Sequence, residues 1–111
     1  MTRDQLIVAT RKLVDDGDRL AVDPSLAALR GWLQASDALL SEAWGSMDRY
    51  HLAWLGVGRP REQVRGRRMT AAEEVDYVRE VAGQKTAALR MSLKAAEDGM
   101  PFRGETDGLA S

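Results

Sequence analysis

Hydrophobic residues recur every three or four positions along most of this chain, which is the spacing of one face of an α-helix. The first series runs from Leu6 to Val14 and follows the segment TRDQ at positions 2–5, which has the spacing of a capping box. Gly17, with aspartates on both sides, suits the left-handed residue that ends many helices. The pattern therefore predicts a short first helix that ends within residues 15–18.

A longer series follows the dipeptide Asp23-Pro24, in which Asp23 suits an N-cap and Pro24 the first helical position. Steps of three and four continue as far as Leu55, so the pattern predicts one helix over residues 24–55, roughly 48 Å long at 1.5 Å per residue. A break near residue 35 is the alternative. The series consists of Leu26, Leu29, Leu33, Ser36, Leu40, Ala43, Trp44, Met47, His51, Trp54 and Leu55.

A third series begins after the segment TAAE at positions 70–73, which has the spacing of a second capping box. It reaches Ala96, and Asp98-Gly99 with Pro101 just beyond predicts the end of this helix. Residues 102–111 show no helical period and predict a flexible C-terminal tail. The chain is therefore expected to form a single helical domain over residues 1–101 with a tail over 102–111.

These elements predict an all-α fold, a short N-terminal helix plus a long two-helix hairpin. Each long helix buries one stripe of apolar residues, and one short helix covers only part of the apolar surface that remains exposed. We therefore expect a homodimer whose hairpins complete a helical bundle. The residues expected at an oligomer or partner interface are Leu29, Leu33, Leu40, Trp32, Trp44, Met47, His51 and Trp54.

The composition is that of one globular domain of 111 residues, with 44% hydrophobic and 30% charged residues and a net charge of -1. The chain has no cysteine, which excludes disulfides, zinc–thiolate sites, iron–sulfur clusters and thiol nucleophiles. Arg11 and Lys12 interrupt the N-terminal apolar run, unlike a signal peptide, and no run approaches the roughly 18 residues of a membrane span. We expect a cytoplasmic protein that does not contact membranes.

Catalytic motifs are sparse. His51 is the only histidine, at a core-stripe position, and the chain has no P-loop, Rossmann glycine pattern or HExxH segment. These features predict a non-enzymatic protein with no catalytic residue, cofactor or metal ligand.

One acidic cluster leaves an enzymatic alternative open. Glu73, Asp76 and Glu80 share one helix face, and Glu73-x-x-Asp76 resembles half of the magnesium-binding motif of the all-α nucleotide pyrophosphohydrolases. The preceding helix offers only Asp37 and Glu42, five residues apart, where the family has a second Glu-x-x-Glu. A metal-dependent nucleotide hydrolase is therefore the second alternative function.

Trp54-Leu55-Gly56 resembles the Trp-x-Gly turn of the small secreted helical-hairpin proteins of the WXG type. The resemblance implies a hairpin of two long helices. Two features depart from the family: the connection here is long and rich in arginine, and Tyr77 is followed four residues later by Val81 instead of an acid.

Residues 56–69 carry five arginines and one glutamate, so this segment has a charge of +4 and the rest of the chain -5. Gly58-Arg59-Pro60-Arg61 resembles the core of an AT-hook, in which Arg-Pro keeps the backbone extended in a narrow minor groove. The interpretation we favour is a regulator- or inhibitor-type binding module whose loop contacts an acidic protein partner; a nucleic-acid-binding protein is the alternative. The plain structural alternative is a solvated connection between two helices, whose arginines keep it soluble and pair with Glu73, Glu74 and Asp76 or with the acidic turn at residues 15–18. The loop residues expected to bind are Arg59, Arg61, Arg65, Arg67 and Arg68.

Overall fold

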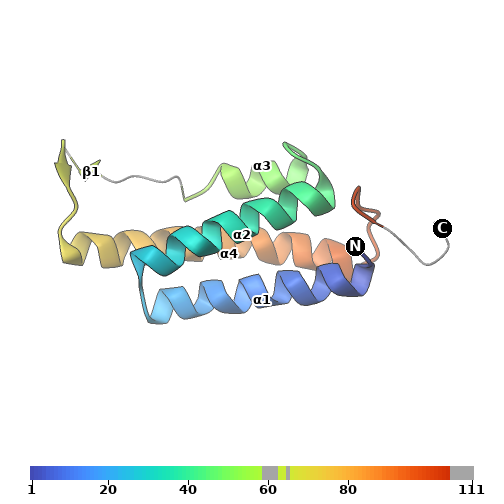
Figure 1. The fold of residues 1–111 in the computed structure, drawn as a ribbon, viewed down its shortest axis with the longest axis horizontal. Coiled ribbons are helices and arrows are strands. Elements are labelled where there is room, and N and C mark those ends of the chain that lie inside the picture. The colour runs from blue at the N-terminus through green and yellow to red at the C-terminus, as the bar shows by residue number, and fades with distance from the viewer. Residues whose placement is uncertain (59–62, 65, 106–111) are drawn as a thin grey trace.

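The structure is a computed structural model that describes residues 1–58, 63, 64 and 66–105. Within these residues the fold is helical apart from one pair of two-residue strands, and the all-α part of the prediction is confirmed. Three helices run side by side along the long axis of an elongated molecule of 54 × 25 × 20 Å (Figure 1). The elements are α1 (Arg3–Val22), α2 (Leu26–Trp44), α3 (Arg49–Leu55), β1 (Gln63–Val64), β2 (Arg67–Arg68) and α4 (Ala71–Glu97).

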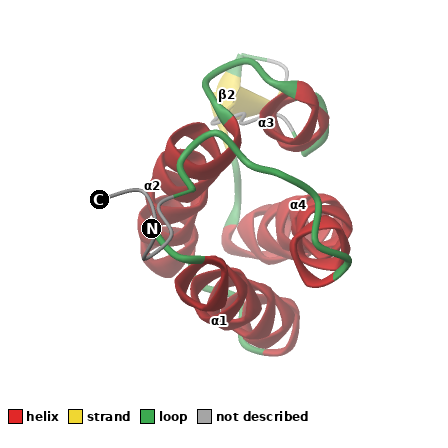
Figure 2. Ribbon diagram, turned by 90° about the vertical axis from the view of Figure 1, so that its right-hand side faces the viewer, coloured by secondary structure: helices red, strands yellow, loops and turns green. Residues whose placement is uncertain are grey.

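The described helices surround one core. Viewed along the long axis, α1, α2 and α4 lie around the interior and α3 fills the corner opposite α1 (Figure 2). A single chain therefore closes its own bundle. The dimer was predicted from a two-helix hairpin with uncovered apolar faces, and such a hairpin is not what the chain forms. Self-association itself stays a prediction. The largest fully buried apolar side chains are Leu6, Leu29, Leu40, Val78, Val81 and Leu89.

The first helix is longer than the sequence predicts. It passes through Gly17 and ends at Val22, so the predicted end within residues 15–18 is wrong. Gly17 is buried where α1 approaches α2 and α4, and a Cβ atom there would lie 2.8 Å from Cζ2 of Trp32 and would also collide with the hydroxyl of Thr86. Because glycine has no side chain, it permits α1 to pack closely against α2 and α4 at this position.

The single helix predicted over residues 24–55 is also wrong, as is the alternative break near residue 35. α2 ends at Trp44, followed by Gly45 with φ 105° and Met47 with φ 66°, and α3 begins after Asp48. The Trp44 ring packs 4.5 Å from that of Tyr50, measured between centroids. This aromatic contact across the turn stabilises the reversal that places α3 on α4. At the other end Ser25, and not Asp23, is the N-cap of α2.

Both predicted capping boxes are confirmed. The hydroxyls of Thr2 and Thr70 accept hydrogen bonds from the backbone N–H of Gln5 and Glu73, whose side chains bond back to the N-cap N–H groups. The end of α4 is confirmed as well, since Asp98 is its C-cap and Gly99 has φ 84°.

The residues just beyond α4 pack against the helices. Phe102 is buried with its ring 5.9 Å from that of Trp44, and the backbone N–H of Gly104 donates to the carbonyl of Ala43. Residues 102–105 of the predicted tail are therefore in contact with α2, and residues 106–111 lie outside the described residues.

The connection from α3 to α4 contains strands that the sequence did not predict. β1 and β2 pair antiparallel, with Gln63 opposite Arg68 and Val64 opposite Arg67. This hairpin lies at the end of the molecule where α4 begins (Figure 1). In the described part of the chain, no helix combines the length and apolarity needed to cross a membrane.

Candidate functional site

Four of the five aromatic and sulfur-containing residues predicted at an interface lie inside the core of one chain. Trp32, Trp44, His51 and Trp54 are buried, and the indole N–H of Trp32 donates to the carbonyl of Leu13 at 2.8 Å. Met47 is 60% exposed in the turn before α3. A role for these residues in an interface stays a prediction. Packing inside a single chain is sufficient to explain why the four rings lie at apolar positions of the helical pattern.

The predicted loop arginines are described only in part. Arg59, Arg61 and Arg65 lie outside the described residues. Arg67 binds Glu73 with two hydrogen bonds of 2.7 and 3.2 Å, and Arg68 is exposed. At least one loop arginine is therefore folded back onto the start of α4.

The Arg67–Glu73 pair is integrated with the cap of α4. Oε1 of Glu73 also accepts from the backbone N–H of Thr70 at 2.8 Å. The hydrogen bond from Arg67, followed by that from Thr70, lowers the pKa of Glu73 to about 2. Glu73 in turn raises the pKa of Arg67. The pair fixes the β-hairpin to α4 through charge-assisted bonds.

The acidic face of α4 does not converge into a cation site in the structure. Glu73 is held by Arg67, and across residues 1–58, 63, 64 and 66–105 no three His, Asp or Glu side chains lie close enough together to hold a metal ion.

A pocket of about 280 Å³ lies where α2, α3 and α4 meet. Its lining combines apolar side chains with two charged groups of opposite sign, Asp37 and Lys85, which come from α2 and α4. The remaining residues that line it are Leu33, Gln34, Trp54 and Leu55. A pocket that places a buried amine near an exposed carboxylate is the strongest candidate for a small-molecule site in the described part of the chain.

Lys85 is the unusual residue of this pocket, because it is only 2% exposed. Its Nζ atom donates a hydrogen bond of 2.6 Å to the carbonyl oxygen of Trp54 and lies 3.9 Å from the centroid of the Trp54 ring. Trp54 is in the last turn of α3, where carbonyl oxygens lack helical partners and attract cations. Burial lowers the pKa of Lys85 to about 8, and the carboxylate of Asp37 acts in the opposite direction.

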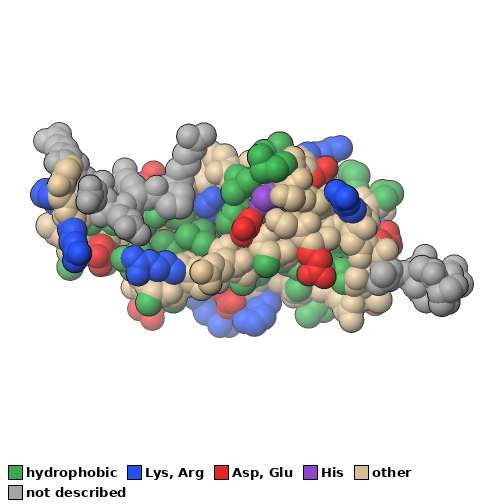
Figure 3. Space-filling view, turned by 45° about the horizontal axis from the view of Figure 1, so that its top comes forward, with side chains coloured by type: hydrophobic (Ala, Val, Ile, Leu, Met, Phe, Trp, Pro, Cys, Tyr) green, Lys and Arg blue, Asp and Glu red, His purple; other side chains and the backbone are tan. Residues whose placement is uncertain are grey.

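Asp37 is linked to the α2–α3 turn through His51. Nε2 of His51 lies 2.5 Å from Oδ1 of Asp37, while Nδ1 accepts from the backbone N–H of Met47 at 2.9 Å. Because Nδ1 is an acceptor, the proton of this imidazole is on Nε2, which donates to Asp37. The His51 ring also lies nearly parallel to that of Trp54, with centroids 6.3 Å apart. In Figure 3 the histidine (purple) lies beside acidic and hydrophobic side chains on this face.

The chain leaving α3 covers part of Lys85. The backbone N–H of Gly58 donates to Oε1 of Gln84 at 2.8 Å. A Cβ atom at Gly58 would lie 3.2 Å from the backbone Cα of Val81 and 3.4 Å from Cγ of Lys85, and Gly58 has φ 55°. Glycine therefore permits this segment to pass directly over the aliphatic part of Lys85.

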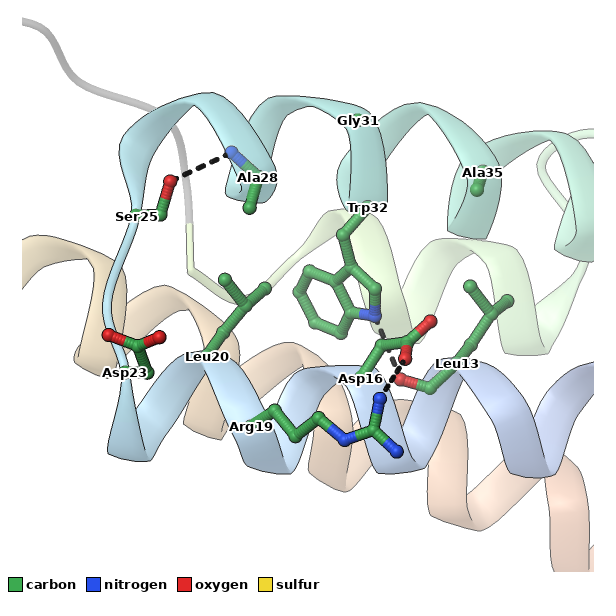
Figure 4. A pocket seen from close by; sticks show the side chains of 10 residues that line it. All are labelled: Leu13, Asp16, Arg19, Leu20, Asp23, Ser25, Ala28, Gly31, Trp32 and Ala35. Atoms are coloured by element: carbon green, nitrogen blue, oxygen red, sulfur yellow. Dashed lines mark hydrogen bonds and ion pairs between the residues drawn. The ribbon is translucent and has the colours of Figure 1, made fainter.

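A second pocket, of about 410 Å³, lies between α1 and α2 (Figure 4). Its charged side chains, Asp16, Arg19 and Asp23, are partly or fully exposed, and Asp16 pairs with Arg19 at 3.6 Å. The other residues that line it are Leu13, Leu20, Ser25, Ala28, Gly31, Trp32 and Ala35. This groove is larger than the Lys85 pocket, but its charged groups are not desolvated.

No protein-family model, curated protein or solved structure matches this chain. The hairpin of two long helices implied by the WXG resemblance is not present in the structure, because Trp54 belongs to α3, a helix of only 7 residues. Sequence patterns missed both Lys85 and the link between Asp37 and His51.

Proposed function

We propose that this protein is a non-enzymatic α-helical binding module that contacts an acidic protein partner through residues 56–69. The observation that carries the proposal is the position of the β-hairpin at one end of the molecule, with Arg67 and Arg68 exposed there. The Arg67–Glu73 pair anchors the hairpin to α4, so binding by the other arginines would not require the hairpin to form on contact.

An acidic protein is favoured over nucleic acid by the charges that surround the hairpin. Glu73, Glu74 and Asp76 lie in the first turns of α4, directly after the basic segment. A nucleic acid presents continuous phosphates, which would meet this acidic face as well as the arginines. A protein surface with a local carboxylate cluster can contact the arginines and avoid the acids.

The experiment compares two probes at two salt concentrations by fluorescence anisotropy: a glutamate-rich peptide and a short DNA duplex. Arg59, Arg61, Arg65 and Arg68 are changed together to Gln, which keeps the anchoring Arg67. The matched control removes the same charge elsewhere by changing Arg11, Arg19, Arg49 and Arg103 to Gln. Salt-sensitive peptide binding that only the hairpin variant loses is the expected result.

Two results would contradict the proposal. Equal loss in the hairpin variant and the control would show that net charge, and not the hairpin, controls binding. Stronger binding of the duplex than of the peptide would favour the nucleic-acid alternative.

Self-association is a separate proposal about the same module. Leu52 and Leu55 lie one turn apart on α3 and are 46% and 37% exposed, and Met47 precedes them. We propose a homodimer in which two copies cover these side chains. Light scattering after size exclusion tests it: a monomer at tens of micromolar removes the proposal, and a dimer that Leu52→Glu dissociates supports it.

A further inference from the structure

We propose that Lys85 is the reactive amine of a small-molecule site, and that the pocket between α2, α3 and α4 admits a small apolar aldehyde or ketone that forms an imine with Nζ. Lys85 is part of the lining of this pocket of about 280 Å³. The apolar side chains of Leu33, Trp54 and Leu55 line the same space. This site is separate from the basic hairpin and does not depend on the function proposed for it.

The chemistry is nucleophilic addition to a carbonyl group followed by loss of water. The ammonium group of Lys85 first releases one proton to solvent, and the neutral amine then forms a C–N bond to the carbonyl carbon as the C–O π bond breaks. One proton moves from the nitrogen to the oxygen, which gives a neutral carbinolamine. The proton released at the start returns to the hydroxyl oxygen, the C–O bond breaks as the nitrogen lone pair forms the C=N bond, and water leaves, so that ammonium and carbonyl are converted to a protonated imine and one water molecule. No oxidant or reductant is required.

The surroundings of Nζ suit a protonated imine as well as an ammonium ion. The imine keeps the positive charge, which lies over the ring of Trp54 and in the field of the Asp37 carboxylate. Of the three N–H groups of the ammonium ion, one remains in the protonated imine. The carbonyl oxygen of Trp54, 2.6 Å from Nζ, is positioned to accept a hydrogen bond from that group.

The other two lysines of the chain provide the comparison. Lys12 and Lys94 pair with Asp16 and Asp98, and their side chains are 74% and 78% exposed. Burial lowers the pKa of Lys85 to about 8, so a larger fraction of this amine is neutral near pH 7.5 than of an ordinary lysine. Lys85 is therefore expected to react faster than the two lysines that are open to solvent.

The test uses isobutyraldehyde as the probe and cyanoborohydride to trap the imine as a stable secondary amine, at about pH 7.5. Mass spectrometry after digestion by a protease that does not cleave at lysine locates each adduct, and the N-terminal peptide is scored separately. We expect the adduct at Lys85 to form on the order of ten times faster than at Lys12 or Lys94. Labelling of Lys12 and Lys94 with Lys85 unmodified would overturn the proposal and leave Lys85 a structural cation.

A second variant separates reaction in the pocket from reaction in a transiently unfolded chain. Leu33 is partly buried and lines the pocket, so Leu33→Phe should obstruct it. Slower labelling of Lys85, with unchanged labelling of Lys12, supports the pocket as the route. Unchanged or faster labelling of Lys85 would overturn it, because a variant that only loosens the fold exposes the amine more often.

Discussion

The Nζ atom of Lys85 lies 3.9 Å from the centroid of the Trp54 ring and donates to the carbonyl oxygen of the same residue. One buried cation therefore joins α4 to the last turn of α3. The indole face and the helix-terminal carbonyl both attract it. Burial opposes the charge more strongly, because the pKa of Lys85 is lowered to about 8.

This balance predicts that the protein becomes more stable as the pH rises from about 8 to 10.5. In the unfolded chain Lys85 has its ordinary pKa of 10.5, so the unfolded state binds more protons than the native state over this window. The gain is complete above 10.5 and is lost as the pH falls through 8. Urea unfolding of the wild type and of Lys85→Met at several pH values measures it. The difference between the two proteins should change over this window, and equal slopes would contradict the prediction.

Gly17→Ala should destabilise the protein although it places a better helix former in α1. The new Cβ atom would lie 2.8 Å from Cζ2 of Trp32 and collide with the hydroxyl of Thr86, and overpacking of this kind costs about 1–3 kcal/mol. Gly31→Ala is the matched control, because nothing lies within 4 Å of its Cβ position in α2. The control should gain up to about 1 kcal/mol in denaturant unfolding. A gain in both variants would show that α1 can move away from α4.

Met47→Gly should stabilise the turn between α2 and α3. Met47 has φ 66° and is 60% exposed, so glycine removes the strain of a left-handed residue and loses little burial. We expect a gain of about 1 kcal/mol in the free energy of unfolding, measured by thermal and urea denaturation. Met47→Ala keeps the strain and should show no gain. A loss of stability in the glycine variant would mean that Met47 contributes through a contact of its side chain, such as the proposed dimer.

The same turn explains why the sequence pattern predicted one long helix. Trp44, Met47, His51 and Trp54 keep helical steps of three and four, although a turn separates the first from the last two. The turn preserves the spacing while it reverses the chain, so periodicity alone cannot detect it. Gly45 followed by Asp48 is the signal for a helix end and a new N-cap, and it becomes decisive only once the Trp44–Tyr50 contact is known.

Lys85 shows the same limit at the candidate site. Helical spacing requires a residue on the inner face about three or four positions after Ala82, but the apolar series of the third predicted helix has no member there. This series consists of Ala72, Val75, Val78, Ala82, Leu89, Leu93 and Ala96. Lys85 and Thr86 fill this gap, and both are buried. The gap could have indicated a buried lysine, but its partner, the carbonyl of Trp54, belongs to a helix that the sequence did not separate from α2. The capping boxes at Thr2 and Thr70 were predictable because their signals lie within four consecutive residues.

Arg67→Gln should raise the pKa of Glu73 from about 2 toward its ordinary value of 4.5, because the largest cause of the low value is the hydrogen bond from Arg67. The stabilising contribution of this carboxylate is present above pH 4.5 and is lost as the pH falls toward 2. NMR titration of the Glu73 side-chain carboxyl measures the midpoint directly. Arg68→Gln is the control, since it removes the same charge from the neighbouring residue and leaves both bonds to Glu73 in place. An equal rise of the midpoint in Arg68→Gln and Arg67→Gln would contradict the prediction. The combined positive charge of the hairpin, and not the Arg67–Glu73 pair, would then lower the pKa of Glu73, and no single arginine would anchor the hairpin to α4.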